Sequence, residues 1–69
     1  MEHPEQLTEH EEAVLRLIAM GYSGKEIAAR LDASPNIVEA RKNRACEKLG
    51  IRSRGALVRY AVTRGWMRY

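Results

Sequence analysis

The sequence repeats a helix-start signal four times within 69 residues, and this repetition limits the fold more than any other feature. Glu11 and Glu26 each follow a predicted N-cap by three residues, the spacing of a capping box in which two side chains bond each other's backbone N–H. Pro35 follows the third cap directly, at the first helical position, where its missing N–H costs nothing. The predicted N-caps are Thr8, Ser23, Ser34 and Ser53.

Glycine stop signals follow three of the four predicted helices, and the short turn Asp32-Ala33 follows the second. Gly21, Gly50 and Gly65 stand where a left-handed residue commonly closes a helix. Apolar residues recur at helical spacing between the caps, and no segment alternates with period two, so strands are not expected. The sequence predicts an all-α fold of four helices, at about 8–20, 24–31, 35–49 and 54–64.

The second and third predicted helices are joined only by the turn Asp32-Ala33. A connection this short favours a crossed pair of the helix-turn-helix kind, in which the second helix can enter the major groove of DNA. Helix spacing alone leaves an ordinary small helical bundle as the alternative.

Charge is divided between the two halves of the chain. Residues 1–38 carry three Lys/Arg against seven Asp/Glu, whereas residues 39–69 carry nine Lys/Arg against two Glu. Segregation of this kind is typical of a domain with one face that meets a polyanion.

Several classes of protein are disfavoured by what the sequence contains. Cys46 is the single cysteine and cannot form an intramolecular disulfide, which favours a reducing, cytoplasmic location. No apolar run approaches the length of a membrane span, and the acidic N-terminus is unlike a signal peptide. His3 and His10 stand without partners at metal-ligand spacing. We therefore expect no metal, no cofactor and no enzymatic activity.

Two segments, LTEHEEAVLRLIAMGYSGKEIAARL and SPNIVEARKNRACEKLGIRSRGALVRYA, together resemble the LuxR/FixJ-type (GerE-like) domain of bacterial transcription regulators. The resemblance covers about residues 7–65 and implies a helix-turn-helix DNA-binding domain at 7–69, after a short extension at 1–6. Four positions depart from the family pattern, among them Ala45 and Cys46, which stand where the family usually has larger apolar residues. Ile37 replaces a usual threonine and loses a hydroxyl that could reach a phosphate, while Arg41 replaces a frequent histidine and keeps a cationic donor.

Helix 35–49 corresponds to the recognition helix of that family. Val38, Ala45 and Leu49 form its predicted core stripe, with Ile37 and Cys46 near it. The opposite side would face base edges, where amides pair with adenine, a carboxylate accepts from cytosine and a small apolar residue touches a thymine methyl. The predicted base contacts are Asn36, Glu39, Ala40 and Asn43. For Glu39 the alternative is a surface ion pair with Lys42, three residues on.

Cationic side chains around this helix, together with Ser34 at its start, are assigned to contacts with DNA phosphates. Such contacts supply affinity without sequence information. The alternative for each is a solvated surface side chain. The predicted phosphate contacts are Lys25, Ser34, Arg41, Lys42, Arg44, Lys48 and Arg54.

The last helix carries more apolar residues than one buried side requires. The resemblance implies a homodimer that forms through this helix and binds inverted half-sites of double-stranded DNA. The alternative is that all of these apolar residues belong to the core. The tail Trp66–Tyr69 either folds back or contacts a partner. The rival function is a protein-interaction module of the same fold that binds another regulator or RNA polymerase. The predicted dimer contacts are Leu57, Val58, Ala61 and Val62.

Overall fold

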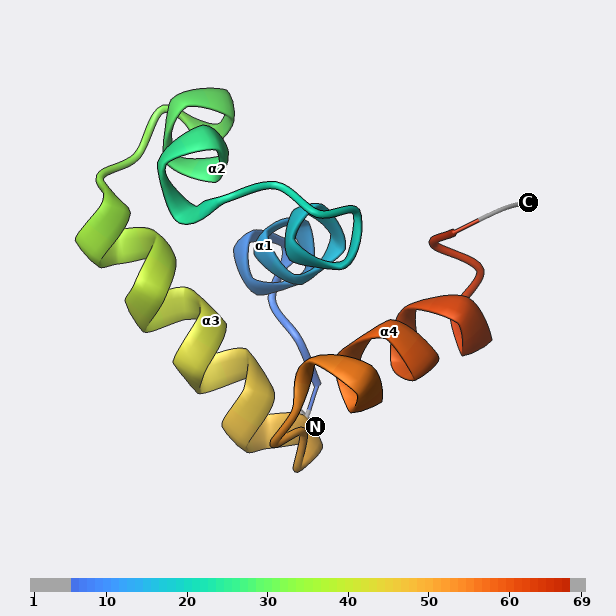
Figure 1. Ribbon diagram of the computed structural model, residues 1–69. Helices are drawn as coiled ribbons and strands as arrows, with labels where there is room; N and C mark the ends of the chain where they lie inside the picture. The colour runs from blue at the N-terminus through green and yellow to red at the C-terminus, as the bar shows by residue number, and fades with distance from the viewer. Residues whose placement is uncertain (1–5, 68–69) are drawn as a thin grey trace.

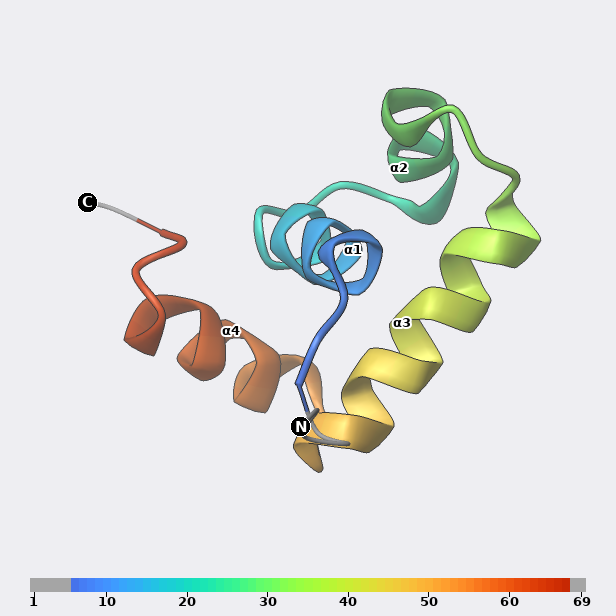
Figure 2. The same cartoon turned by 180° about the vertical axis from the view of Figure 1, so that it is seen from behind.

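The first helix, α1 (Glu9–Ala19), lies between the other three in the computed structural model, which describes residues 6–67 (Figure 1). On one side of α1 lie α2 (Gly24–Leu31) and α3 (Pro35–Leu49), and on the other lies α4 (Arg54–Thr63). Figure 2 shows the same arrangement from behind. Every regular element in the described range is a helix, which confirms the predicted all-α, four-helix class.

Both predicted capping boxes are present. Thr8 Oγ1 accepts from the Glu11 backbone N–H at 3.1 Å, and Glu11 Oε1 accepts from the Thr8 N–H at 3.0 Å. Ser23 and Glu26 make the same pair of bonds at 3.2 and 2.7 Å. Thr8 has extended backbone angles, so α1 begins one residue later than predicted.

α3 begins and ends at the predicted residues, whereas α4 begins at the predicted Arg54 and ends at Thr63, one residue before the predicted end. Ser34 Oγ accepts from the Ile37 N–H at 3.2 Å, and Ser53 Oγ accepts from the Ala56 N–H at 3.1 Å. Gly50 closes α3 in the left-handed region, with φ of 69°. A residue with a side chain is disfavoured there, which accounts for the Lys-Leu-Gly sequence at this helix end.

Two clusters of buried side chains hold the helices together. One lies where α1 meets α2 and the first half of α3, and the other lies where α1 meets the second half of α3, α4 and Trp66 beyond the end of α4. Ile18 packs against both clusters. The first cluster is Val14, Ile27, Ala28 and Val38, and the second is Leu15, Ala19, Ala45, Leu57, Ala61 and Trp66.

The start of the C-terminal tail folds back into the second cluster. The Trp66 backbone N–H donates to Ala61 O at 2.9 Å, and the indole is 8% exposed. Its ring meets Tyr60 edge to face at a centroid distance of 5.4 Å, and the Arg16 guanidinium lies 5.4 Å from its centroid. Tyr69, the end of the predicted tail, lies outside the described residues.

Three further properties of residues 6–67 bear on function. None of their helices is long and apolar enough to cross a membrane. No three of their His, Cys, Asp or Glu side chains are arranged to hold a metal ion. Burial raises the pKa of the half-buried Cys46 thiol, and the nearby Lys42 offsets this only in part. The thiolate, which is the reactive form, is therefore disfavoured.

Candidate nucleic-acid interface

The turn between α2 and α3 sets the direction in which α3 leaves the body. Asp32 has φ of 55° and ψ of 48°, a left-handed conformation that Asp tolerates better than most residues with a side chain. The Ala33 N–H donates to Ala28 O at 2.9 Å and closes the end of α2. Val38 then packs against Ile27 and Ala28 and fixes the first half of α3.

The outward side of α3 is open to solvent along its length. Because the buried residues of α3, Val38 and Ala45, lie on one stripe, the side chains about two positions away from them face outward. All four predicted base contacts are exposed: Asn36, Glu39, Ala40 and Asn43. Their contact with bases stays a prediction, but the geometry leaves them free to make it.

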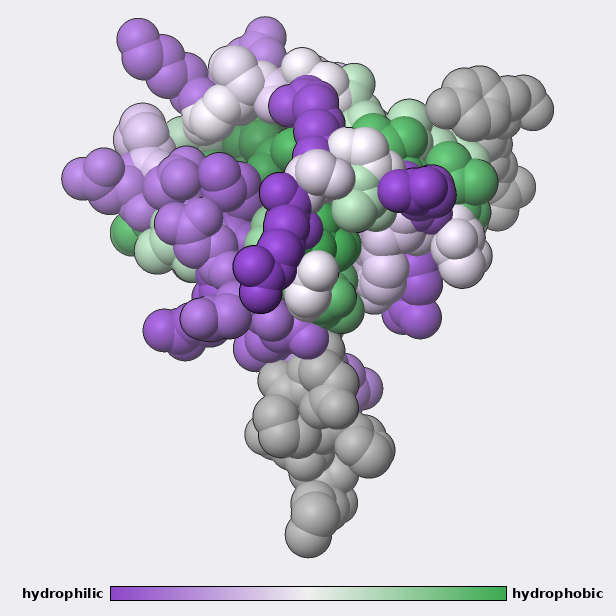
Figure 3. Space-filling model, turned by 60° about the horizontal axis from the view of Figure 1, so that its bottom comes forward, coloured by the Kyte–Doolittle hydropathy of each residue, from purple (hydrophilic) through white to green (hydrophobic). Residues whose placement is uncertain are grey.

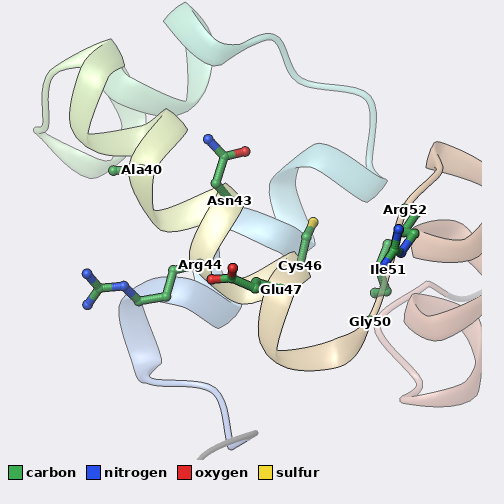
Figure 4. A pocket seen from close by; sticks show the side chains of 8 residues that line it. All are labelled: Ala40, Asn43, Arg44, Cys46, Glu47, Gly50, Ile51 and Arg52. Atoms are coloured by element: carbon green, nitrogen blue, oxygen red, sulfur yellow. The ribbon is translucent and has the colours of Figure 1, made fainter.

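Glu47 belongs to the same outward side, and the sequence reasoning missed it. It is exposed and lies one turn beyond Asn43, in a hollow of about 490 Å³ that also includes Ala40 and Arg44 (Figure 4). The signal was its position four residues after Asn43, which places both on one helical face. The outward side of α3 therefore carries an acid near each end, Glu39 and Glu47.

The predicted phosphate contacts differ in how far they reach solvent. Lys25, Ser34, Arg44 and Arg54 are exposed, whereas Arg41 and Lys42 are half-buried at the two borders of α3. Figure 3 shows hydrophilic side chains gathered on the side of the molecule that α3 forms, at the left of the view. The Arg54 guanidinium donates to Ile18 O at 3.4 Å, a long bond that leaves its other N–H groups free.

Glu39 and Lys42 form the ion pair that the sequence left as the alternative reading. Lys42 Nζ lies 3.1 Å from Glu39 Oε2, and both side chains reach solvent. Exposed pairs of this kind are worth about 1 kcal/mol or less. The pair can therefore open at little cost when a base or a phosphate offers another partner.

Lys48 has a partner that the sequence did not predict. Its ammonium donates to Glu11 Oε1 at 2.8 Å and to Gln6 O at 3.3 Å. The contact joins the last turn of α3 to the first turn of α1, across 37 positions of sequence. Its contact with a phosphate stays a prediction, and Glu11 and Gln6 already occupy two of the three N–H donors of the ammonium.

Glu11 is the buried acid at the centre of this contact, with 4% of its surface exposed. Burial raises the pKa of its carboxyl, but the hydrogen bonds from Lys48 and from the Thr8 backbone outweigh it and hold the pKa below its ordinary value. The carboxylate is therefore charged, capped and paired at neutral pH.

Ile37 was predicted near the core stripe of α3, and that placement is wrong. The side chain is 45% exposed, because Val38 takes the inward direction at this turn of α3. It lines a hollow of about 290 Å³ with Ala40, Arg41 and Arg44.

The four residues of α4 that were predicted to contact a second chain fall into two pairs. Leu57 and Ala61 are 4% and 0% exposed and lie in the second core cluster, so their assignment to a dimer contact is corrected to core. Val58 is half-buried and Val62 is 47% exposed, which leaves these two side chains available to a partner.

Comparison with known sequences agrees with this architecture. Residues 5–61 match the family described as "Bacterial regulatory proteins, luxR family". The chain is also 46% identical over 56 residues to the "Oxygen regulatory protein NreC" of Staphylococcus aureus, in strains JH9, JH1 and Mu3 among others. The alignment covers 81% of this chain and 26% of the relative, so the chain spans about a quarter of the length of the relatives that it matches. No solved structure gives a significant match.

Proposed function

Because the chain belongs to the luxR family of bacterial regulatory proteins, we propose that it binds double-stranded DNA sequence-specifically and regulates transcription in the bacterial cytoplasm. Residues 7–69 would form the DNA-binding domain, after a short extension at 1–6. In this proposal α3 enters the major groove, which accommodates one α-helix, and α2 crosses the backbone above it.

The base contacts are assigned to the outward side of α3. The amides of Asn36 and Asn43 can each pair with an adenine edge, and Ala40 allows the close approach that such pairing needs. Glu39 can accept from cytosine N4 once Lys42 turns to a phosphate. A carboxylate left without a donor in the groove costs free energy, so Glu39 would act mainly by rejecting wrong sites.

The phosphate contacts are assigned to the borders of that side. Arg41 and Arg44 follow one border of α3, and Lys42 and Arg54 follow the other. Lys25 and Ser34 lie at the starts of α2 and α3, where backbone N–H groups also favour an anion. Ser34 Oγ accepts from the Ile37 N–H and keeps its own hydroxyl hydrogen for a phosphate oxygen.

A homodimer is proposed through the outer side of α4, with Val58 and Val62 as its apolar contacts. Two copies related by a twofold axis would place their α3 helices one DNA turn apart on inverted half-sites. The chain is close to the lower size limit for a self-sufficient core, and an interface would add buried apolar surface.

The observation that carries the proposal is the outward side of α3, where amide and small side chains lie between two cationic borders. The test is fluorescence anisotropy with a labelled random-sequence duplex, repeated from low to high salt. We expect affinity to fall steeply with salt, because each phosphate that the protein neutralises releases a counterion and lowers the log–log slope by about 0.9.

Weak or salt-insensitive association would contradict the proposal. It would favour the rival function, a module of the same fold that binds another regulator or RNA polymerase. The exposed Val62 side chain would then be the first place to look for that partner.

A further inference from the structure

Ile37 is one of three large hydrophobic side chains that are widely exposed within residues 6–67, with Met20 and Val62. Unlike those two, it lies on the helix that is assigned to the groove. Its backbone N–H is already bonded to Ser34 Oγ, so the cap fixes it in the first turn of α3. The first turn is the part of a recognition helix that meets base edges.

The surroundings of Ile37 combine apolar and cationic side chains. Ala40 lies one turn further along, and the two side chains line a single hollow with Arg41, Arg44 and His10. Glu11 also lines this hollow, but Lys48 holds its carboxylate at 2.8 Å. The protein leaves the apolar side chain of Ile37 exposed to solvent. Contact with a charged phosphate would not stabilise such an apolar surface.

One chemical group in the major groove of DNA can pack against an exposed apolar side chain. Thymine carries a C5-methyl group there, on the side of the base nearest its own backbone, and apolar side chains recognise it by contact. The thymine methyl group would then contact the apolar side chains of the hollow, and a phosphate of the same strand would contact its cationic side chains. We propose that Ile37 reads a thymine through this methyl group, with Arg41 or Arg44 on the adjacent phosphate.

The inference rests on the proposed DNA binding and adds a specificity-determining residue to it. It also gives a physical role to the replacement of the family's usual threonine at this position. The hydroxyl that could reach a phosphate is lost, and an apolar contact with a base takes its place.

The experiment compares thymine with uracil, because deoxyuridine keeps the base pair and lacks only the methyl group. A duplex selected by the wild-type chain from a random library is made with each thymine replaced singly by deoxyuridine. We expect the wild-type chain to lose about fourfold in affinity at one position, the size for one methyl group withdrawn from contact. Ile37→Ala should show no difference at that position, and Ile37→Val should keep most of it.

Met20→Ala is the matched control, since Met20 is exposed, large and on the far end of α1. It should show the same uracil penalties as the wild-type chain. Equal penalties in Ile37→Ala and wild type at every position would overturn this inference and leave DNA binding standing. A complete lack of salt-dependent duplex binding would overturn both.

Discussion

The ammonium of Lys48 lies 2.8 Å from the buried carboxylate of Glu11 and joins the end of the proposed groove-reading helix to the start of α1. The two residues are 37 positions apart in the sequence. Because Glu11 also completes the cap of α1, one side chain connects helix capping to the packing of α3. The contact makes α3 a fixed part of the body at its C-terminal end.

Replacing Lys48 by methionine should destabilise the fold by about 1–3 kcal/mol, because the Glu11 carboxylate would stay buried without its charged partner. Urea unfolding followed by circular dichroism measures the change. Lys42→Met is the matched control, since its pair with Glu39 is exposed and should cost about 0.5 kcal/mol or less. Equal losses in the two variants would contradict a structural role for Lys48.

The pH dependence of stability should report the same contact. Folding lowers the pKa of Glu11, so its contribution is complete above the ordinary value of 4.5 and is lost as the pH falls through the folded-state pKa below it. Glu11→Gln should therefore be less stable than wild type at neutral pH, and its stability should fall less steeply below that value. Parallel curves for the two proteins, from urea midpoints across acidic pH, would rule out a lowered Glu11 pKa.

Arg44 should behave as a pure phosphate contact, because it is exposed and makes no ion pair among residues 6–67. Arg44→Ala is expected to weaken binding to all duplexes and to flatten the salt slope by about one unit. Arg64→Ala removes the same charge at the end of α4, where the guanidinium lies over Tyr60, and should leave the slope nearly unchanged. Similar slopes for both variants would mean that the charge acts only through the overall field.

Substitution of Asn43 or Glu39 should change which DNA sequence is preferred, whereas substitution of Arg44 should change the affinity for all sequences. If Asn43 contacts a base, Asn43→Ala is expected to reduce the binding free energy by about 1–3 kcal/mol on the selected site and by less on mismatched sites. Glu39→Ala should relax the rejection of wrong sites. Competition binding against a set of single-base variants measures both. An unchanged ranking of sites would show that neither side chain reads a base.

A substitution at Val62 tests the proposed homodimer. Val62→Glu places a charge on the outer side of α4 and should yield a folded monomer, because the side chain is 47% exposed and lies outside the core. Sedimentation equilibrium measures the mass, with Met20→Glu as a control at a similarly exposed apolar residue just after α1. A wild-type chain that is monomeric alone and on inverted half-sites would contradict the dimer.

Local signals account for what the sequence predicted well. Helix ends depend on side chains within three or four residues, so the caps at Thr8, Ser23, Ser34 and Ser53 could be read directly. The family resemblance added the helix-turn-helix arrangement.

Features that depend on tertiary packing could not be predicted in this way. The pairing of Lys48 with Glu11 spans 37 positions, and no periodicity indicates it. The exposure of Ile37 and the division of α4 into buried and open residues depend on which neighbour covers each helix face. Trp66 joined the core for the same reason, since the chain turns back at Gly65, where φ is 77°.

The two core clusters divide the packing of the domain along α1, and Ile18 contacts both of them. One cluster holds α2 and the first half of α3, the other holds α4, and α2 contributes to none of the packing around α4 within the described residues. Substitutions in positions without shared neighbours usually have additive effects. Substitutions that touch only α2 should therefore add in their effect on stability to those that touch only α4, whereas substitutions in α1 and α3 affect both clusters.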